Sequence, residues 1–228
     1  MPVWQVYPNK MKGFLIRILS LALPLALAVS SVAAGPISFG GGWNEQRLQI
    51  FNSNDYSFNG GSMTLVSDGG VSLAWTRTGR GDWGATAVSW NWSVDQSVPA
   101  TDLRRKGGDD RNISIYFVFL PEADANAMEG ANIRQLNNNP NVRILQYVWG
   151  GNHARGSIQN SPYAPGPGAN VILRAAGTGS NSENVNLAND FAAAFGGAPG
   201  ALVGIAVSGD SDDTGTAVRA SISNLAVR

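Results

Sequence analysis

The sequence of 228 residues has no cysteine, a single histidine and only 14% charged residues. Without cysteine the protein has no disulfide, no thiol nucleophile and no cysteine-based zinc site. With one histidine, a zinc site would have to be built largely from carboxylates. His153 follows Gly150 and Gly151 and is interpreted as a loop residue rather than a catalytic base. No glycine-rich phosphate-binding motif lies between a strand and a long helix, so a nucleotide cofactor is not expected.

The N-terminal segment has the order of features typical of a secretory signal. Lys10, Lys12 and Arg17 precede an apolar run over residues 18–29, and small residues follow at 31–34. The run is short for a membrane span, which needs roughly 20 apolar residues. We therefore expect residues 1–34 to be a signal peptide, with Met11 as the more ordinary start, cleaved after residue 33 or 34. The alternative is a retained N-terminal anchor.

The remaining chain is weakly acidic. Residues 35–228 carry 13 Lys and Arg against 16 Asp and Glu, a net charge of −3. This charge argues against a nucleic-acid partner, and no membrane span is expected in this part. We expect one domain over residues 35–228, in a protein that is periplasmic or secreted.

Short runs of β-branched and aromatic residues alternate with Gly, Asn, Ser and Asp along this domain. The pattern predicts an all-β fold, a jelly-roll-like antiparallel β-sandwich with one short helix. Leu187, Phe191 and Phe195 recur every four residues before Gly196, which predicts the helix. The polar segment 123–139 is interpreted as a surface insertion, helical in its first half. Strands are expected over residues 47–51, 62–66, 71–77, 85–94, 112–120, 143–149, 170–174, 201–208 and 217–227.

The tryptophans divide into core and surface candidates. In the strand over 85–94, Trp90 and Trp92 fall on the apolar face with Val88 and Val94. Paired aromatic residues on such a face indicate a core, and a sugar-stacking platform is the alternative. Trp83, in a Gly-Arg-Gly-Asp stretch, is expected to be the most exposed.

Two polar clusters stand out, over residues 101–111 and 210–215. In the second, Asp210, Asp212 and Thr214 occupy alternate positions before Gly215, as in the first half of a calcium loop. Ser221 stands where an EF-hand requires Glu, so a complete EF-hand is excluded. A calcium ion could instead be completed by a carboxylate of the first cluster, Asp109 or Asp110. The alternative is an Asx-rich turn whose carboxylates bond local N–H groups and pair with Arg104, Arg105 or Arg111.

From residue 89 to the C-terminus, a series of motifs occurs in order. They are Trp90-Asn91-Trp92, Val94-Asp95, Pro99, Asp102-Leu103-Arg104, Lys106, Gly108-Asp109-Asp110, Tyr116-Phe117-Val118-Phe119, Tyr147-Val148-Trp149, Ser161-Pro162-Tyr163, Glu183, Asp190-Phe191, Phe195-Gly196, Val203-Gly204-Ile205-Ala206 and the 210–215 cluster. In these motifs the chain resembles the bacterial domain-of-unknown-function family 3047. The resemblance implies an exported β-sandwich without an established activity, similar in shape to jelly-roll modules that bind carbohydrate. Relatives tend to have Trp where this chain has Ser182.

Three functions follow as hypotheses. The first is a module that binds a glycan or another envelope component, because planar polar groups beside an aromatic ring suit sugars. Its candidate residues are Asp109, Asp110, Arg111, Trp149, Tyr163, Asp212 and Asp213. The second is a glycan-active enzyme in which Asp109 or Asp110 faces Asp212 or Asp213 across a cleft. The third is a structural interaction module whose carboxylates are sealed by Arg104, Arg111 or Arg219.

A serine hydrolase is disfavoured. Ser211 and His153 could form a nucleophile and base, but Asp212 and Asp213 follow Ser211 directly. Their negative charges would oppose a developing oxyanion.

Overall fold

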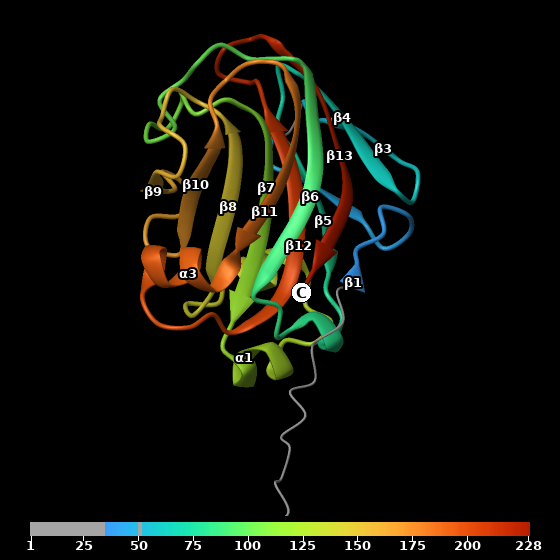
Figure 1. Ribbon diagram of the computed structural model, residues 1–228, viewed down its shortest axis with the longest axis vertical. Helices are drawn as coiled ribbons and strands as arrows, with labels where there is room; N and C mark the ends of the chain where they lie inside the picture. The colour runs from blue at the N-terminus through green and yellow to red at the C-terminus, as the bar shows by residue number, and fades with distance from the viewer. Residues whose placement is uncertain (1–34, 50–51) are drawn as a thin grey trace, which may run out of the picture. The chain divides into compact units, whose positions relative to one another are not determined.

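The computed structural model describes residues 35–49 and 52–228, which form two β-sheets packed face to face (Figure 1). The proposed signal peptide, residues 1–34, lies outside the described residues, as do residues 50–51 of the first expected strand.

One sheet has six strands, five of them in the order β11-β6-β13-β4-β3, with β1 paired to β13. All its pairs are antiparallel. The strands are β1 (Gly35–Pro36), β3 (Asp55–Phe58), β4 (Ser62–Asp68), β6 (Ala87–Gln96), β11 (Gly179–Asn186) and β13 (Ala217–Val227).

The other sheet has seven strands in the order β2-β5-β12-β7-β8-β10-β9. Its pairs are antiparallel except β8 with β10, which run parallel, so the antiparallel expectation is wrong for this one pair. The strands are β2 (Asn44–Arg47), β5 (Ser72–Arg77), β7 (Arg111–Leu120), β8 (Arg143–Gly150), β9 (Ile158–Asn160), β10 (Gly168–Arg174) and β12 (Ala201–Asp210).

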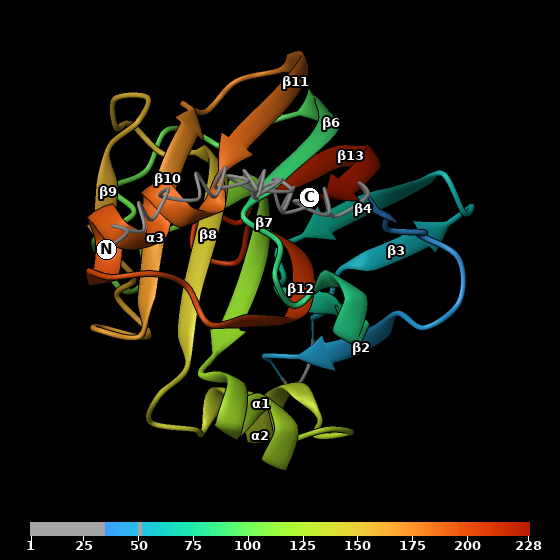
Figure 2. The same cartoon turned by 60° about the horizontal axis from the view of Figure 1, so that its bottom comes forward.

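The predicted all-β sandwich is therefore confirmed, with more helix than expected. The predicted helix is α3 (Leu187–Phe195). The polar segment between β7 and β8 forms two short helices, α1 (Glu122–Ala127) and α2 (Ile133–Asn137), which lie together at one end of the molecule's described part (Figure 2). A 3₁₀ turn covers Arg80–Asp82. In the described part of the chain, no helix is long and apolar enough to cross a membrane.

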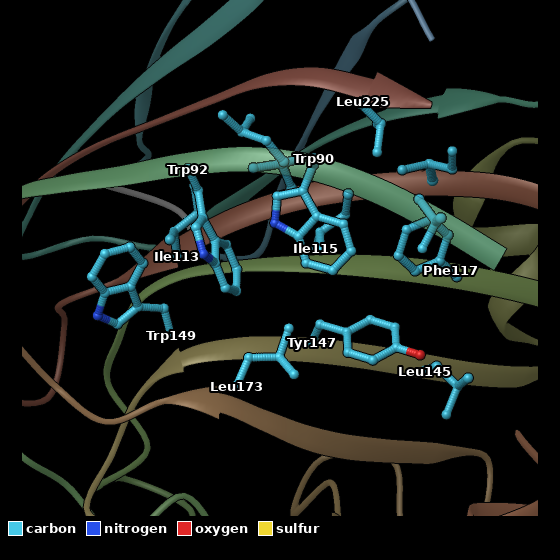
Figure 3. Packing of buried hydrophobic residues seen from close by; sticks show 14 of the residues in the cluster. Trp90, Trp92, Ile113, Ile115, Phe117, Leu145, Tyr147, Trp149, Leu173 and Leu225 are labelled. Carbon is cyan, nitrogen blue, oxygen red and sulfur yellow. The ribbon is translucent and has the colours of Figure 1, made fainter. Parts of the chain in front are cut away.

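The core lies between the two sheets and is rich in aromatic rings (Figure 3). Trp90 and Trp92 are buried there, with ring centroids 5.3 Å apart in an edge-to-face arrangement. The core interpretation of these two residues is confirmed. Trp149 also belongs to this core, with its ring centroid 5.6 Å from that of Trp92.

Trp83 is not the exposed residue that its glycine-rich surroundings suggested. It is half-buried against the small apolar cluster under α1 and α2, and the Arg80 guanidinium lies 4.7 Å from its ring. The chain between β7 and β8 folds back over Trp83, a long-range contact that local composition does not reveal. The large hydrophobic residues that are exposed instead are Leu48, Phe58 and Tyr163.

Candidate functional site

The candidate site is a cleft on the outer face of the seven-stranded sheet, the face turned away from the core. Strand pairing places one residue from each of four neighbouring strands in a row across this face. From β10 to β12 the row is Asn170, Gln146, Tyr116 and Ala206. All four residues line a cleft with a volume of about 630 Å³.

Segments on either side of the row cover the rest of this face. The loop between β6 and β7 (residues 97–110) places Leu103 against Val148 and Ile172. On the opposite side, α2 places Leu136 in an apolar cluster with Val118. Between these two covers, polar or small residues form the bottom of the cleft, where Asn170, Gln146 and Ala206 are themselves largely buried. The cleft therefore runs across the strands.

Arg111 is the centre of the charged groups in the cleft. Its Nη1 lies 3.1 Å from Asp109 Oδ2 and 3.0 Å from Asp210 Oδ2, and all three side chains are buried. Its Nη2 donates to the hydroxyl of Tyr116 over 3.0 Å, and its Nε donates to Ser114 Oγ over 3.2 Å. Arg111 thus fixes the positions of both carboxylates and joins them to the row on the floor.

Burial is the largest cause of the pKa shifts of the two carboxyl groups beside Arg111. It raises the pKa of Asp210 to about 8, although the charge of Arg111 acts in the opposite direction. Burial also raises the pKa of Asp109, again opposed by Arg111. Burial alone would lower the pKa of Arg111, but its net shift is upward because Tyr116, Asp210 and Asp109 favour the charged guanidinium. Arg111 is therefore a permanent cation in this site.

Two buried side-chain oxygens in the cleft have no hydrogen-bond partner in the described part of the chain. They are Oδ1 of Asn170 and Oδ1 of Asp210, each on a residue that lines the cleft. Leaving a buried acceptor without a hydrogen bond costs about 1–3 kcal/mol. Such groups in a cleft floor are suited to a ligand with hydroxyl groups, which can donate to the amide oxygen of Asn170 and can donate to or accept from the carboxyl of Asp210.

The rim of the cleft carries an exposed aromatic residue, Tyr163, one of the candidate ligand-binding residues. Tyr163 is 61% exposed and lines the cleft. Its hydroxyl accepts a hydrogen bond from the N–H of Gly107 over 3.3 Å, and Lys106 Nζ lies 5.4 Å from its ring. Tyr163 is thereby held beside the 97–110 loop. Asp212, half-buried, also lines the cleft and accepts a hydrogen bond from Gln49.

Asp110 and Trp149 differ from what the sequence suggested. Asp110 is fully buried and accepts hydrogen bonds from the backbone N–H groups of Asp213 (3.2 Å) and Thr214 (2.7 Å) and from the Thr214 hydroxyl. It joins the two polar loops rather than facing the cleft. Trp149 points into the core because its position alternates with the outward-facing Val148. Neither residue lines the cleft.

Of the three arginines that the sequence suggested as partners of the loop carboxylates, Arg111 is the one that pairs with carboxylates of the cleft. Arg104 instead pairs with Asp102 at 2.8 Å, and Arg219 is exposed. Asp213 is also exposed and lies outside the cleft lining, so the expected pair across the cleft is not formed by Asp110 and Asp213. The carboxylates that share the cleft are Asp109, Asp210 and Asp212.

The calcium hypothesis involves a partly different set of residues in the structure. Asp110, Asp212 and Asp213 each offer an oxygen, and these atoms lie within 4.8 Å of one another. Asp210 faces Arg111, and the hydroxyl of Thr214 is bonded to Asp110. The calcium site stays a prediction.

His153 and Ser211 have structural contacts. His153 Nε2 accepts a hydrogen bond from the N–H of Leu103 over 3.1 Å and lies 3.3 Å from Asp102 Oδ1, so it supports the 97–110 loop. Ser211 is fully buried, with its hydroxyl 2.8 Å from that of Ser67.

Sequence reasoning missed Tyr116, Gln146 and Asn170. A signal for them was present, because Gln146 and Asn170 are polar residues inside strands that are otherwise apolar. Each could equally have been a buried core polar group. Only the strand pairing shows that they lie side by side.

The family assignment follows from a family-model comparison. The model described as "Protein of unknown function (DUF3047)" matches residues 41–226. The chain belongs to the DUF3047 family. The resemblance seen in the motifs is thus confirmed, and it extends to residues well before Trp90. A search of curated proteins finds no match for this DUF3047 member.

The solved structures that this chain matches have very different sequences. The xyloglucanase domain of NopAA from Sinorhizobium fredii, in complex with cellobiose, is 11% identical, with a TM-score of 0.44, 85% of this chain covered and 95% of that chain. A loop-swap mutant of Xyn11A from Neocallimastix patriciarum is 10% identical (TM-score 0.42, coverage 86% and 94%). The family 11 xylanase of that organism is also 10% identical (TM-score 0.41, coverage 86% and 99%). Similarity at this level does not identify a ligand.

Proposed function

We propose that this DUF3047 protein binds a carbohydrate, a glycan or a related envelope component, in the cleft on the outer face of the seven-stranded sheet. The observation that carries the proposal is the pair of buried oxygens without a hydrogen-bond partner, Asn170 Oδ1 and Asp210 Oδ1, in the cleft. Sugar hydroxyls both donate and accept, so they suit the amide oxygen of Asn170 and the carboxyl oxygen of Asp210 in either protonation state, and a bound sugar would remove the cost of leaving these groups unpaired.

The rest of the lining fits the two surfaces of a sugar ring. Gln146 and Arg111 present planar polar groups that suit hydroxyl edges, while Val118 and Ile144 supply apolar surface for the ring faces. The exposed ring of Tyr163 adds an aromatic wall at the rim. The cleft volume of about 630 Å³ is in the range typical of small-molecule sites.

The test is direct binding of the purified protein to a panel of soluble glycans, followed by titration calorimetry with those that bind. We expect Tyr163→Ala and Asn170→Ala to weaken binding roughly 5–30-fold, since each removes about 1–2 kcal/mol of contact. Asn91→Ala is the matched control, because Asn91 is also an amide on a sheet's outer face but lies on β6 of the other sheet. The proposal fails if no glycan binds, or if both cleft variants bind as well as Asn91→Ala.

A second candidate, glycoside hydrolysis, is suggested by two neighbouring carboxylates whose separation lies below the range of inverting enzymes. Asp109 Oδ2 and Asp210 Oδ2 both lie within 3.1 Å of Arg111 Nη1, so these oxygens are no more than about 6 Å apart. Retaining glycosidases use a separation of about 5–5.5 Å, whereas inverting enzymes need about 6.5–9.5 Å. Incubation with the glycans that bind, followed by assay for new reducing ends, tests this candidate. Bound glycans that stay intact would leave binding as the function.

We propose further that the protein acts outside the cytoplasm, in the periplasm or after secretion. The basic residues, the apolar run and the small residues of the N-terminal segment support this location. An extracytoplasmic location would also expose the cleft to envelope glycans.

A further inference from the structure

We infer that Trp75 forms a distal aromatic subsite of the cleft, so that the ligand is an extended oligosaccharide chain lying across the strands rather than a single sugar. The inference rests on the proposed carbohydrate-binding function. It concerns a residue that neither the sequence motifs nor the cleft lining include.

Strand pairing places Trp75 next in the row of residues on the cleft floor. Trp75 on β5 pairs with Ala206 on β12, and Ala206 pairs with Tyr116 on β7. Directly paired residues project on the same face, with Cβ atoms about 4.5–5.5 Å apart. The row of Asn170, Gln146, Tyr116 and Ala206 therefore continues to Trp75.

Trp75 also adjoins the cleft along its own strand. Leu73, two residues earlier on β5, lies on the same face and lines the cleft. Inward-facing Ala74, between them, is fully buried in the core, which confirms that Leu73 and Trp75 face outward. Trp75 thus lies just beyond the cleft margin.

Trp75 keeps part of its surface exposed to solvent. It is half-buried, and in the described part of the chain it packs against no other aromatic ring. Trp43, Trp90, Trp92 and Trp149, by contrast, each pack against at least one. Ala206, between Trp75 and Tyr116, has a short side chain that is 1% exposed, so it lies below the two larger side chains beside it. A chain lying over Tyr116 would therefore reach the indole next.

The length of the row indicates the class of ligand. Asn170 and Trp75 lie on strands separated by four strand spacings, roughly 19 Å at about 4.8 Å each. One sugar ring cannot contact both ends of such a row. A linear chain of several rings can, with hydroxyl edges on Asn170 and Gln146 and a ring face on the indole.

The test is a chain-length series measured by titration calorimetry. The probes are glucose through cellohexaose and the chitooligosaccharides of the same lengths. We expect affinity to increase with length beyond the disaccharide, and Trp75→Ala to remove that increase, a loss of roughly 5–10-fold for the longest chains with little effect on the shortest. Trp75→Phe should retain most of the affinity.

Controls separate the possible outcomes. Phe58→Ala removes an exposed aromatic residue from β3 of the other sheet and should leave the length dependence intact. Trp75→Leu keeps an apolar side chain on β5, so it tests the ring if Trp75→Ala does not fold. If oligosaccharides bind but Trp75→Ala and Trp75→Leu keep the full length dependence, or if no such dependence exists, the subsite is overturned and the binding function stands. If neither these oligosaccharides nor any member of the glycan panel binds, the proposed function falls, and the subsite with it.

Discussion

Trp92 donates a hydrogen bond from its indole Nε1 to Oε1 of Glu183 over 3.2 Å, joining β6 to the edge strand β11 inside the sandwich. The same carboxylate pairs with Arg174 on β10 of the opposite sheet at 2.8 Å and with Arg155 at 3.2 Å. Glu183 is 4% exposed. One buried carboxylate thus connects the two sheets at the side where β11 and β10 lie.

Replacing Glu183 should destabilise the fold. Glu183→Ala removes the acceptor of Trp92 and leaves two arginines without a partner, so we expect a loss of about 2–3 kcal/mol in the free energy of unfolding. The loss of stability should be smaller than for a fully buried ion pair, because both arginines are partly exposed and water can solvate them after the substitution. Urea unfolding measures it, with Glu45→Ala, an exposed glutamate on β2, as the control. Equal stability of the two variants would contradict the role given to Glu183.

The stability of the protein should fall as pH rises from about 4 to about 8, through Asp210. Its pKa is raised from 3.8 to about 8 by burial, so the folded protein keeps a proton that the unfolded chain releases over this range. The contribution is complete below the unfolded pKa and is lost as pH rises through the folded pKa. Asp109, whose pKa is also raised, adds an effect of the same sign.

Unfolding curves of the wild type and of Asp210→Asn, measured across this pH range, test that sign. The variant cannot titrate at this position, so its stability relative to the wild type should improve steadily from pH 5 to pH 8. Asp55→Asn, an exposed aspartate on β3, should show no such trend. A difference between wild type and Asp210→Asn that stays constant with pH would refute the assignment.

We expect Asp110 to stabilise the fold by joining the two polar loops, and not to contact a ligand in the cleft. Asp110→Ala removes the acceptor of two backbone N–H groups and one hydroxyl, and we expect it to cost about 2–3 kcal/mol. Thr214→Val removes the contacts of its hydroxyl with Asp110 and Thr216 but keeps both backbone bonds to Asp110, and it should cost about 1–2 kcal/mol. Thermal unfolding gives the order of the two losses, and a reversed order would show that Asp110 does not join the loops as described.

The calcium site proposed for the 210–215 loop has its own test. Ca²⁺ should raise the unfolding temperature of the protein and a chelator should reverse the rise, because an ion that binds only the folded state stabilises it. Asp212→Ala should abolish the effect, whereas Asp68→Ala, an exposed aspartate on β4, should preserve it. An unfolding temperature that is insensitive to Ca²⁺ would remove the calcium site and leave these aspartates as turn and ion-pair residues.

Export through a cleaved signal peptide would fix the first residue of the mature protein. Protein recovered from the periplasm or the medium should begin at residue 34 or 35, after cleavage behind Ala33 or Ala34. Mass spectrometry of the intact protein measures this. An N-terminus upstream of residue 18 on the mature protein would instead favour the retained anchor.

Local patterns in the sequence predict those parts of the fold that depend on neighbours along the chain. The alternation over β6 correctly places Trp90 and Trp92 in the core, and the expected strand over 217–227 has the observed bounds of β13. The four-residue spacing before Gly196 correctly predicts α3. In contrast, β11 was not predicted, because its exposed face is almost entirely Ser and Asn. It becomes a strand by pairing along its whole length with β6.

The all-β class, the aromatic core and the polar loops that hold Asp109 and Tyr163 could be predicted from the sequence, because each depends on periodicity or composition over a few residues. The cleft could not, because it is formed by residues that are far apart in the sequence. Residues 116, 146, 170 and 206 share its floor through strand pairings that connect distant parts of the chain, including the parallel pair β8 and β10. A shift of one residue in any of those registers would turn the side chain to the other face of the sheet. That register depends on burial of the whole core and cannot be read from any one segment.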